Sequence, residues 1–571
     1  MANRTNVVYA GSNDGLLHGF RAGNSSGTAS NDGYELIGYM PSTVLSSQTT
    51  SPNTTPNVVA LTNITYGHNY FVDGTPGTGD LYYGGAWHTW LAGGMGEGGK
   101  EIYILDITNP STFSESNAAT LVIGDWTDAT ISCTNASCSA NMGKSYGTPI
   151  IRRLHNGQWA VIFGNGIGSS SGLAGVYVGL VSQSTGAITF YWLGTNAATS
   201  NGISYVSAAD FDGDRITDYL YAGDLQGNVW RFDLTSSNPL DWGASKYGQG
   251  AATPLFTAKS GGGAIQPITS SILGTVTNTG GTQRVILGFG TGQAIPFGTS
   301  ANQQINPPVN LYSTGQQTVY GIWDWDFGKW NSGTTTTHSV VIPASPVQLA
   351  SLTGTQTISR SNLLANSVAS ETQPVPATTT TQRIPGKRTV AQTSVCWKGS
   401  ASCPNTLNTS TTNNQYGWMF DLPDNSLTGV SGVPTANQTC PSTGGTNCEQ
   451  IVYNPTFVGG EMILNTTTPP TSIPGQCTVP VPGGWTMGFS MASGGGTPQD
   501  LFTGAGSGTG SSVVGESLGG VGTGLIMTTG GTNPTVNLIT STGAASPPAV
   551  SNQLTLPSNV TVKRVSWEIL R

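Results

Sequence analysis

The acidic segment from Asp210 to Asp218 is the part of the sequence whose residue types and spacing best fit a chemical role. Four carboxylates and a glycine fall within nine residues of a chain in which only 8% of residues are charged. Like charges this close repel one another unless a cation neutralises them, and a hard divalent ion with oxygen ligands does this best. We therefore predict a calcium site. Its expected ligands are the side chains of Asp210, Asp212, Asp214 and Asp218 and the backbone carbonyl of Ile216.

The spacing matches the first nine positions of an EF-hand loop, but the segment is not an EF-hand. Gly213 stands at position 4 rather than 6, Tyr221 replaces the glutamate of position 12, and no helical pattern flanks the segment. A strand from Tyr219 to Gly223 is expected to follow directly, because this run is aromatic and apolar. Magnesium fits less well, since it prefers fewer protein ligands and retains its waters. The alternative to a metal site is a solvated acidic turn.

The composition is typical of turn-rich β structure. The 571 residues include 80 glycines, and the charged fraction of 8% lies far below the usual share of about 25%. A total of 14 Trp, 19 Tyr and 15 Phe supplies enough apolar surface to argue against disorder. The net charge of -8, without any basic block, argues against nucleic acid or an anionic membrane surface as a partner. No apolar run approaches the roughly 18 residues of a membrane span.

The cysteine spacing predicts short disulfide loops. Cys133 and Cys138, Cys396 and Cys403, and Cys440 and Cys448 lie close in sequence, and Cys477 is left over. Cys477 is either free or replaces Cys440 as the partner of Cys448. No CxxC pair occurs and the five histidines are scattered, so an oxidising compartment explains these cysteines better than zinc does.

A short internal repeat indicates the architecture. The pattern YAGxxxGxxxxF occurs twice, from Tyr9 to Phe20 and from Tyr221 to Phe232, and each copy reads as strand, turn and strand. Weaker copies recur along the chain, for example at residues 90–106, 159–178, 285–288 and 418–422. Short strands at such intervals favour radial repetition, and about seven blades of roughly 40 to 50 residues would account for the length. We predict an all-β protein, a single β-propeller domain over residues 1–571 with long loop insertions.

The largest predicted insertion and the predicted ring closure lie in the second half. Residues 353–393 are rich in Ser, Thr, Pro and Gln and are expected to form a low-complexity, exposed insertion. Residues 560–571 alternate as a strand and are expected to close the ring against the strand near Val7. Because Met1 to Thr5 lead straight into a strand without a secretion signal, we interpret the chain as a piece of a larger protein.

Seven ordered segments carry a resemblance to a known family. They are Tyr70–Gly74, Gly84–Thr89, Gly157–Gly166, Tyr221–Trp230, Gly417–Pro423, Asn454–Thr456 with Gly459 and Gly460, and Ser566–Leu570. These segments are similar to the C-terminal domain of PilY/PilC proteins, which are type IV pilus tip-associated adhesins. The similarity spans nearly the whole chain.

The resemblance implies a fold, a ligand and a role. It implies a modified seven-bladed β-propeller of the quinoprotein-dehydrogenase-like kind, with one calcium ion held by the same five residues of the 210–218 segment. It also implies a non-enzymatic role in pilus biogenesis, twitching motility and attachment, in which calcium occupancy regulates pilus extension and retraction. The implied partners are minor pilins at the pilus tip and a host or abiotic surface receptor. The implied location is extracellular, at the pilus tip and bacterial outer membrane, with this domain at the C-terminal end of a larger secreted protein.

The sequence leaves two other functions to consider. A quinoprotein oxidoreductase would use adjacent cysteines beside its quinone, and the sequence has no adjacent cysteine pair. A lectin-like or glycan-cleaving propeller would use exposed aromatic rings and carboxylate pairs. Asp324 and Asp326 alternate on one face of a predicted strand and could form such a pair, but we prefer to interpret them as a solvated strand edge, because half-buried strands show such alternation.

Overall fold

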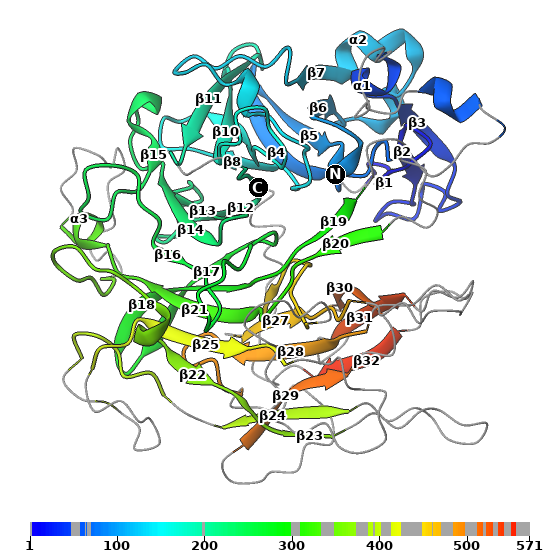
Figure 1. The fold of residues 1–571 in the computed structure, drawn as a ribbon. Helices are drawn as coiled ribbons and strands as arrows, with labels where there is room; N and C mark the ends of the chain where they lie inside the picture. The colour runs from blue at the N-terminus through cyan, green and yellow to red at the C-terminus, as the bar shows by residue number, and fades with distance from the viewer. Residues whose placement is uncertain are drawn as a thin grey trace, which may run out of the picture.

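The computed structural model describes the part of the chain that forms the ordered sheets (Figure 1). The described residues are 3–46, 58–62, 64, 70–196, 200–297, 309–332, 348–372, 386–391, 394–400, 403, 413–423, 448–458, 461–469, 483–496, 511–517, 521–528, 535–541 and 550–555. Within them, the strands form seven sheets of three or more strands and one further hairpin.

The first four sheets come from residues 7–257 and are antiparallel throughout. The first contains β1 (Val7–Gly11), β2 (Leu17–Arg21) and β3 (Glu35–Tyr39). The second contains β4 (Gly77–Tyr83), β5 (Ala86–Gly94), β6 (Glu101–Asp106) and β7 (Val122–Thr127). The third contains β8 (Ile150–Arg153), β9 (Trp159–Gly164), β10 (Gly175–Val181) and β11 (Ile188–Gly194). The fourth contains β12 (Ile203–Ala209), β13 (Tyr219–Asp224), β14 (Asn228–Asp233), β15 (Gly243–Ala244) and β16 (Phe256–Thr257).

The last three sheets are less regular in chain order. In spatial order, the fifth contains β17 (Leu273–Thr279), β18 (Thr282–Gly290), β21 (Thr318–Asp324), β25 (Gly417–Asp421) and β22 (Leu364–Asn366). The sixth contains β23 (Val368–Glu371), β24 (Lys387–Ala391), β29 (Ser511–Ser517), β28 (Trp485–Ser490), β27 (Glu461–Asn465) and β26 (Thr456–Val458). The seventh contains β30 (Val521–Thr528), β31 (Thr535–Ser541) and β32 (Val550–Thr555). The separate hairpin is β19 (Ala294–Phe297) with β20 (Val309–Tyr312).

Helices are short and lie in the connections. The α-helices are α1 (Ser42–Leu45), α2 (Ala118–Leu121) and α3 (Gly328–Asn331). The 3-10 helices are Val58–Thr62, Gly96–Gly98, Pro110–Thr112, Glu115–Asn117, Ser139–Asn141, Pro239–Asp241 and Arg360–Asn362. Among the described residues, no helix has the length and apolar content that crossing a membrane requires.

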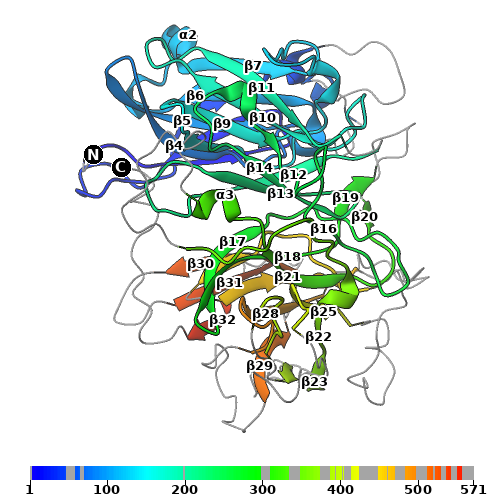
Figure 2. The ribbon, with the colours of Figure 1, turned by 90° about the vertical axis from the view of Figure 1, so that its left-hand side faces the viewer.

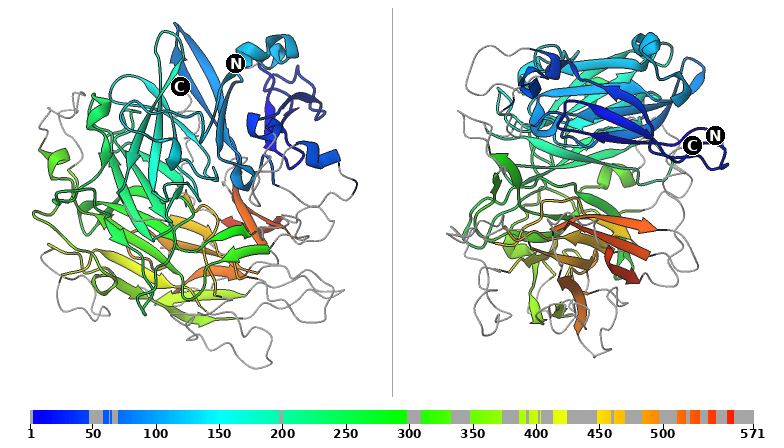
Figure 3. Two further views of the ribbon diagram at one scale, coloured as in Figure 1. Left: turned by 45° about the horizontal axis from the view of Figure 1, so that its top comes forward. Right: turned by 90° about the vertical axis from the view of Figure 1, so that its right-hand side faces the viewer.

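The sheets follow one another around a common centre (Figure 1). In the side views of Figures 2 and 3, the blue and cyan sheets occupy one half of the molecule and the yellow-to-red sheets the other. The burial of β13 explains this arrangement, because all six of its residues are buried although their side chains alternate between the two faces of the strand. Leu220 and Ala222 pack with residues of the third sheet, and Tyr219 and Tyr221 pack with residues of the fifth. The fourth sheet is therefore covered on one face by the third sheet and on the other by the fifth.

Seven sheets that stack face to face around a ring form a modified seven-bladed β-propeller with long insertions, as predicted. The internal repeat is confirmed as well. Its two copies form the antiparallel pairs β1–β2 and β13–β14, so each copy is one strand–turn–strand unit of a blade.

Part of the segment 353–393, for which we predict an exposed low-complexity insertion, forms strands in the region that the structure describes. This segment contributes β22, β23 and β24, and Arg388 and Val390 are completely buried. β22 pairs in parallel with β25, and β24 pairs with β29, which lies more than a hundred residues further along the chain. A composition rich in Ser and Thr resembles that of a linker, but Thr and Val also fit strands once distant partners are present. Residues 373–385 and 392–393 lie outside the described residues.

Two of the predicted disulfides are present, linking Cys133 to Cys138 and Cys396 to Cys403. Cys448 is also disulfide-bonded, and its two candidate partners, Cys440 and Cys477, lie outside the described residues. The predicted ring-closing strand at 560–571 likewise lies outside them.

Candidate metal centre

The acidic segment forms the loop between β12 and β13. These two strands pair so that Ala209 lies opposite Tyr219, and the amide of Asp218 donates a 2.9 Å hydrogen bond to the carbonyl of Ala209. The nine residues between Ala209 and Tyr219 therefore begin and end at one point of the sheet. The predicted strand after the loop is confirmed as β13 (Tyr219–Asp224).

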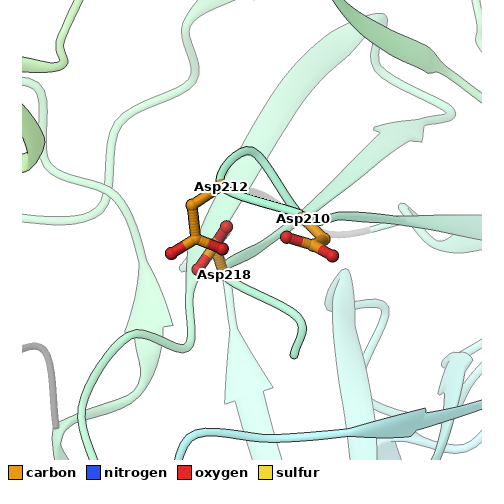
Figure 4. A group of neighbouring side chains, drawn as sticks. All are labelled: Asp210, Asp212 and Asp218. Carbon is orange, nitrogen blue, oxygen red and sulfur yellow. The ribbon is translucent and has the colours of Figure 1, made fainter. Parts of the chain in front are cut away.

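Three of the predicted ligands come together. Asp210, Asp212 and Asp218 each offer a carboxylate oxygen, and these oxygens lie within 4.8 Å of one another. Figure 4 shows Asp210 and Asp212 descending from the two sides of the turn toward Asp218 beneath it. Asp218 is completely buried, Asp212 is half-buried and Asp210 is exposed, so the group opens toward solvent on one side.

Backbone amides of the loop fold around Asp210. The amides of Gly213 and Arg215 donate hydrogen bonds of 2.7 and 2.8 Å to its two carboxylate oxygens. Both donors have left-handed backbone conformations, with φ of 79° at Gly213 and 70° at Arg215. Because such a conformation is unfavourable for a residue with a side chain, its presence at Arg215 shows that the loop constrains its own backbone.

Asp214 contributes a different contact. One of its carboxylate oxygens accepts a 2.7 Å hydrogen bond from the amide of Ile216, and its other oxygen, Oδ2, is buried without a hydrogen-bond partner among the described residues. A buried carboxylate oxygen without a partner is costly, and a cation would satisfy it. The carbonyl of Ile216 as a ligand stays a prediction.

His155 is a member of the site that the sequence reasoning missed. Its Nε2 lies 2.9 Å from Oδ1 of Asp218, and the exposed fractions of the two side chains are 1% and 0%. The second oxygen of Asp218 accepts a 2.8 Å hydrogen bond from the amide of Phe211. No local pattern could have revealed His155, because it precedes Asp218 by 63 residues and belongs to the turn after β8.

The electrostatics of the loop point to excess negative charge. Burial, together with the neighbouring charges of Asp218 and Asp214, raises the pKa of Asp212 to about 7. Burial also raises the pKa of Asp218 to about 6, although the hydrogen bonds from His155 and Phe211 oppose this shift. Burial acts to lower the pKa of His155, but its hydrogen bond to Asp218 and the nearby charges outweigh burial and raise it. A cation among these carboxylates would offset both the cost of burying their charges and the repulsion between them.

Phe211 connects the loop to the next blade. Its side chain is buried, and its ring centroid lies 5.6 Å from that of Phe327 and 6.4 Å from that of Trp330. Tyr219, at the other end of the loop, lies 5.7 Å from Phe327. Both ends of the loop therefore pack against the segment that includes α3, and a change in loop shape would be felt there.

Asp324 and Asp326, the two carboxylates that could serve glycan cleavage, both accept hydrogen bonds from Arg231. Asp324 is completely buried and accepts hydrogen bonds of 3.0 and 2.9 Å from Nη1 of Arg231. Asp326 accepts a 3.1 Å hydrogen bond from Nη2 of the same arginine. The expectation of a solvated strand edge is wrong for Asp324, because Tyr221 and Arg231 of the neighbouring fourth blade bind it and Arg231 neutralises it. The pair is a structural ion pair and does not form a free acid and base.

The described residues fit a divalent cation. Hard oxygen ligands converge from Asp210, Asp212 and Asp218, a fourth carboxylate keeps an oxygen without a partner, and a turn with two left-handed residues closes around them. The protein is therefore a seven-bladed β-propeller with an acidic loop at the edge of its fourth blade.

Residues 1–340 match the family model of the PilY1 β-propeller domain. This match covers more than half of the 571 residues, and the chain belongs to this family.

Individual relatives agree with this assignment. A type IV pilus biogenesis factor PilY1 homolog of Xylella fastidiosa is 34% identical over 328 residues, which are 56% of this chain and 19% of that protein. The type IV pilus biogenesis factor PilY1 of Pseudomonas aeruginosa strain PAO1 is 34% identical over 335 residues, which are 56% of this chain and 25% of that protein. The chain thus spans about a fifth to a quarter of the length of these relatives. The crystal structure of the Pseudomonas aeruginosa PilY1 C-terminal domain superposes with a TM-score of 0.62 at 25% identity and covers 97% of this chain and 93% of that one.

Proposed function

We propose that the chain is the calcium-binding propeller domain of a type IV pilus biogenesis factor and tip adhesin. Membership in the PilY1 β-propeller family supports the pilus role, and the names of the relatives describe type IV pilus biogenesis factors. The observation that carries the calcium proposal is the group of three carboxylates whose oxygens lie within 4.8 Å. In this proposal Asp210, Asp212, Asp214 and Asp218 supply side-chain oxygens and Ile216 supplies its backbone carbonyl.

Calcium is the ion that suits this loop best. It accepts six to eight oxygen ligands in flexible geometry, whereas magnesium demands a near-ideal octahedron and keeps more of its waters. Four carboxylates in one short loop supply ample charge for a divalent ion. We expect a dissociation constant between the micromolar and millimolar ranges that sensor and extracellular sites show.

The loop would act as a switch because its ends are packed. Without metal, the carboxylates repel one another and the loop loosens. With metal, the turn closes and fixes Phe211 and Tyr219 against Phe327 of the neighbouring segment. A partner that binds this rim would distinguish the two states, and calcium occupancy would thereby regulate pilus extension and retraction, twitching motility and surface attachment.

The remaining parts of the proposal follow from the family. The domain has a non-enzymatic role at the cell surface, at the pilus tip and outer membrane, with minor pilins and a host or abiotic receptor as partners. An absorption spectrum of the purified domain with and without pyrroloquinoline quinone tests the non-enzymatic part. A bound quinone chromophore would contradict it.

Calorimetry with calcium tests the metal site directly. Wild type should bind one calcium ion, and Asp218→Ala should bind it at least tenfold more weakly, since the variant removes the most buried of the converging carboxylates. Asp241→Ala, which removes an exposed carboxylate outside the loop, is the matched control and should bind as wild type does. Asp218→Lys places a fixed positive charge in the loop and should mimic the occupied state in motility assays. Equal calcium affinities of wild type and Asp218→Ala would refute the site.

A further inference from the structure

A polar pocket lies in the fifth and sixth blades, away from the acidic loop of residues 210–218. Its volume is about 710 Å³, within the range of about 300 to 1,000 Å³ that small-molecule sites occupy. The turn between β17 and β18, the strand β21 and the loop closed by the Cys396–Cys403 disulfide form its walls. Arg284 of β18 and Trp323 of β21 line it and are almost completely buried, with exposed fractions of 3% and 1%.

Arg284 is a buried cation without a carboxylate partner among the described residues. Its Nη1 donates to the carbonyl and hydroxyl of Thr279, and its Nη2 donates a 3.1 Å hydrogen bond to the hydroxyl of Ser400. Its Nε is buried without a hydrogen-bond partner in the part of the chain that the structure describes. The guanidinium lies 4.9 Å from the ring centroid of Trp323 and 5.0 Å from that of Trp397, so two aromatic rings hold its plane in place.

Two further arginines of the described residues are as inaccessible to solvent as Arg284, with exposed fractions of 5% at Arg231 and 0% at Arg388, and both are neutralised. Arg231 binds Asp324 and Asp326, and Arg388 binds Glu449 and Glu371. Burial lowers the pKa of Arg284 to about 10, whereas the glutamates around Arg388 raise the pKa of that side chain against the effect of burial. An arginine that stays charged and buried without a carboxylate is expensive, and a bound anion would compensate for it.

The free edge of the guanidinium has the geometry that a carboxylate needs. Nε and Nη2 form the side-on fork that binds both oxygens of a carboxylate, as they do in the surface pair of Arg21 with Asp32. In Arg284, the one hydrogen bond of this fork within the described residues goes to the Ser400 hydroxyl. The pocket lining contains no aspartate or glutamate and adds a second cation, the exposed Lys398.

The rest of the lining is suited to hydroxyl groups. It includes the amide of Asn278 and the hydroxyls of Thr279, Thr282, Ser351, Ser394 and Ser400. The indole Nε1 of Trp323 is buried without a hydrogen-bond partner in the described structure, so it is a further donor. A ligand with one carboxylate and several hydroxyls would match both features.

We propose that this pocket binds an acidic sugar of the hexuronate class, with its carboxylate on the Nε and Nη2 edge of Arg284 and its hydroxyls on the Thr and Ser side chains around it. The sugar is either free or the terminal residue of an acidic polysaccharide. This proposal does not depend on calcium, since none of the lining residues belongs to the metal loop.

Tryptophan fluorescence and calorimetry on the purified domain test the pocket, because Trp323 and Trp397 line it. We expect D-glucuronate to bind and to change the fluorescence saturably, with an affinity at least tenfold higher than that of glucose, which lacks the carboxylate, or acetate, which lacks the hydroxyls. Glucuronamide, in which a neutral amide replaces the carboxylate, should bind at least tenfold more weakly than glucuronate. A short oligouronate that binds as tightly as glucuronate would indicate the chain end of a polysaccharide, and one that does not bind would indicate the free sugar.

Two variants locate the binding. Arg284→Gln should weaken glucuronate at least tenfold, and Arg21→Gln, which alters a guanidinium on the first sheet, should leave it unchanged. If Arg284→Gln does not fold, the comparison of glucuronate with glucuronamide on wild type still decides the matter. Equal affinities for these two ligands, equal affinities of wild type and a folded Arg284→Gln, or no saturable binding of glucuronate would each overturn the proposal.

Discussion

His155 and Asp218 form a buried hydrogen-bonded pair that joins two blades of the propeller. His155 lies just after the last strand residue of β8 in the third sheet, and Asp218 ends the acidic loop of the fourth. The amide of Thr217 donates a 2.9 Å hydrogen bond to the carbonyl of Arg153 beside this pair. The third blade therefore fixes the orientation of the Asp218 carboxylate, which is the most buried of the proposed metal ligands.

The pair predicts that His155 supports calcium binding without contacting the ion. His155→Phe keeps an aromatic ring but removes the hydrogen bond to Asp218, so the carboxylate loses its fixed orientation. We expect calcium affinity to fall by about 10-fold to 100-fold, as is typical when a ligand loses its hydrogen-bonded support. Calorimetry measures this. His18→Gln is the control, because His18 also binds carboxylates, Asp14 and Glu35, but on the first sheet. An unchanged affinity in His155→Phe would show that His155 has no positioning role.

Calcium should stabilise the folded domain. A ligand that binds only the folded state raises the free energy of unfolding by about 2.7 kcal/mol when its concentration is 100 times its dissociation constant. The melting temperature should therefore rise with added calcium and return to its starting value with EDTA. Asp218→Ala should remove this dependence, and magnesium at the same concentration should raise the melting temperature less. A calcium response that persists in Asp218→Ala would place the responsible site elsewhere.

The buried arginine of β24 should be essential for folding of the sixth blade. Arg388 binds Glu449 through hydrogen bonds of 2.7 and 2.8 Å, and its guanidinium lies 3.9 Å from the ring centroid of Trp485. Arg388→Met removes the guanidinium from a completely buried ion pair with Glu449, which should cost about 3 to 5 kcal/mol of the free energy of unfolding. Denaturant unfolding measures this cost. Arg21→Ala breaks a partly exposed ion pair at the surface and should cost far less. Equal costs of the two variants would contradict the buried position of β24.

The buried carboxyl group of Glu461 should make the free energy of unfolding depend on pH. Glu461 of β27 is 7% exposed, and its Oε2 is buried without a hydrogen-bond partner in the described residues. Burial raises the pKa of Glu461 from 4.5 to about 8. As the pH rises from 4.5 toward 8, the unfolded chain releases this proton while the folded chain retains it, so the folded state loses stability by at most about 5 kcal/mol.

Glu461→Gln tests this dependence, because the neutral amide does not titrate. The variant should gain stability relative to wild type as the pH rises from 5 to 8, and the two proteins should differ least near pH 4.5. Glu115→Gln, at an exposed position, is the control and should keep the wild-type pH profile. A stability difference between wild type and Glu461→Gln that is the same at all pH values would contradict the buried titration.

The elements that the sequence predicted well are those in which local pattern and tertiary environment agree. The two YAGxxxGxxxxF copies became β1–β2 and β13–β14, because a strand, a glycine-containing turn and a returning strand need only neighbouring residues to pair. The disulfide loops at Cys133–Cys138 and Cys396–Cys403 were predictable for the same reason. β22 and β24 were not, since their pairing partners β25 and β29 are distant in the chain and their own composition is that of a loop.

The sequence by itself determined the acidic loop, the repeating strand pairs and the family, because each of these depends on residue types at short, fixed spacings. Only the tertiary structure decided that His155 supports Asp218, that Asp324 is neutralised by Arg231, and that Arg284 has no carboxylate partner among the described residues. The first two relationships join residues from different blades, and the third depends on the absence of a carboxylate near Arg284 among the described residues. Charge pairing between blades depends on distances in space, and no spacing along the chain specifies them.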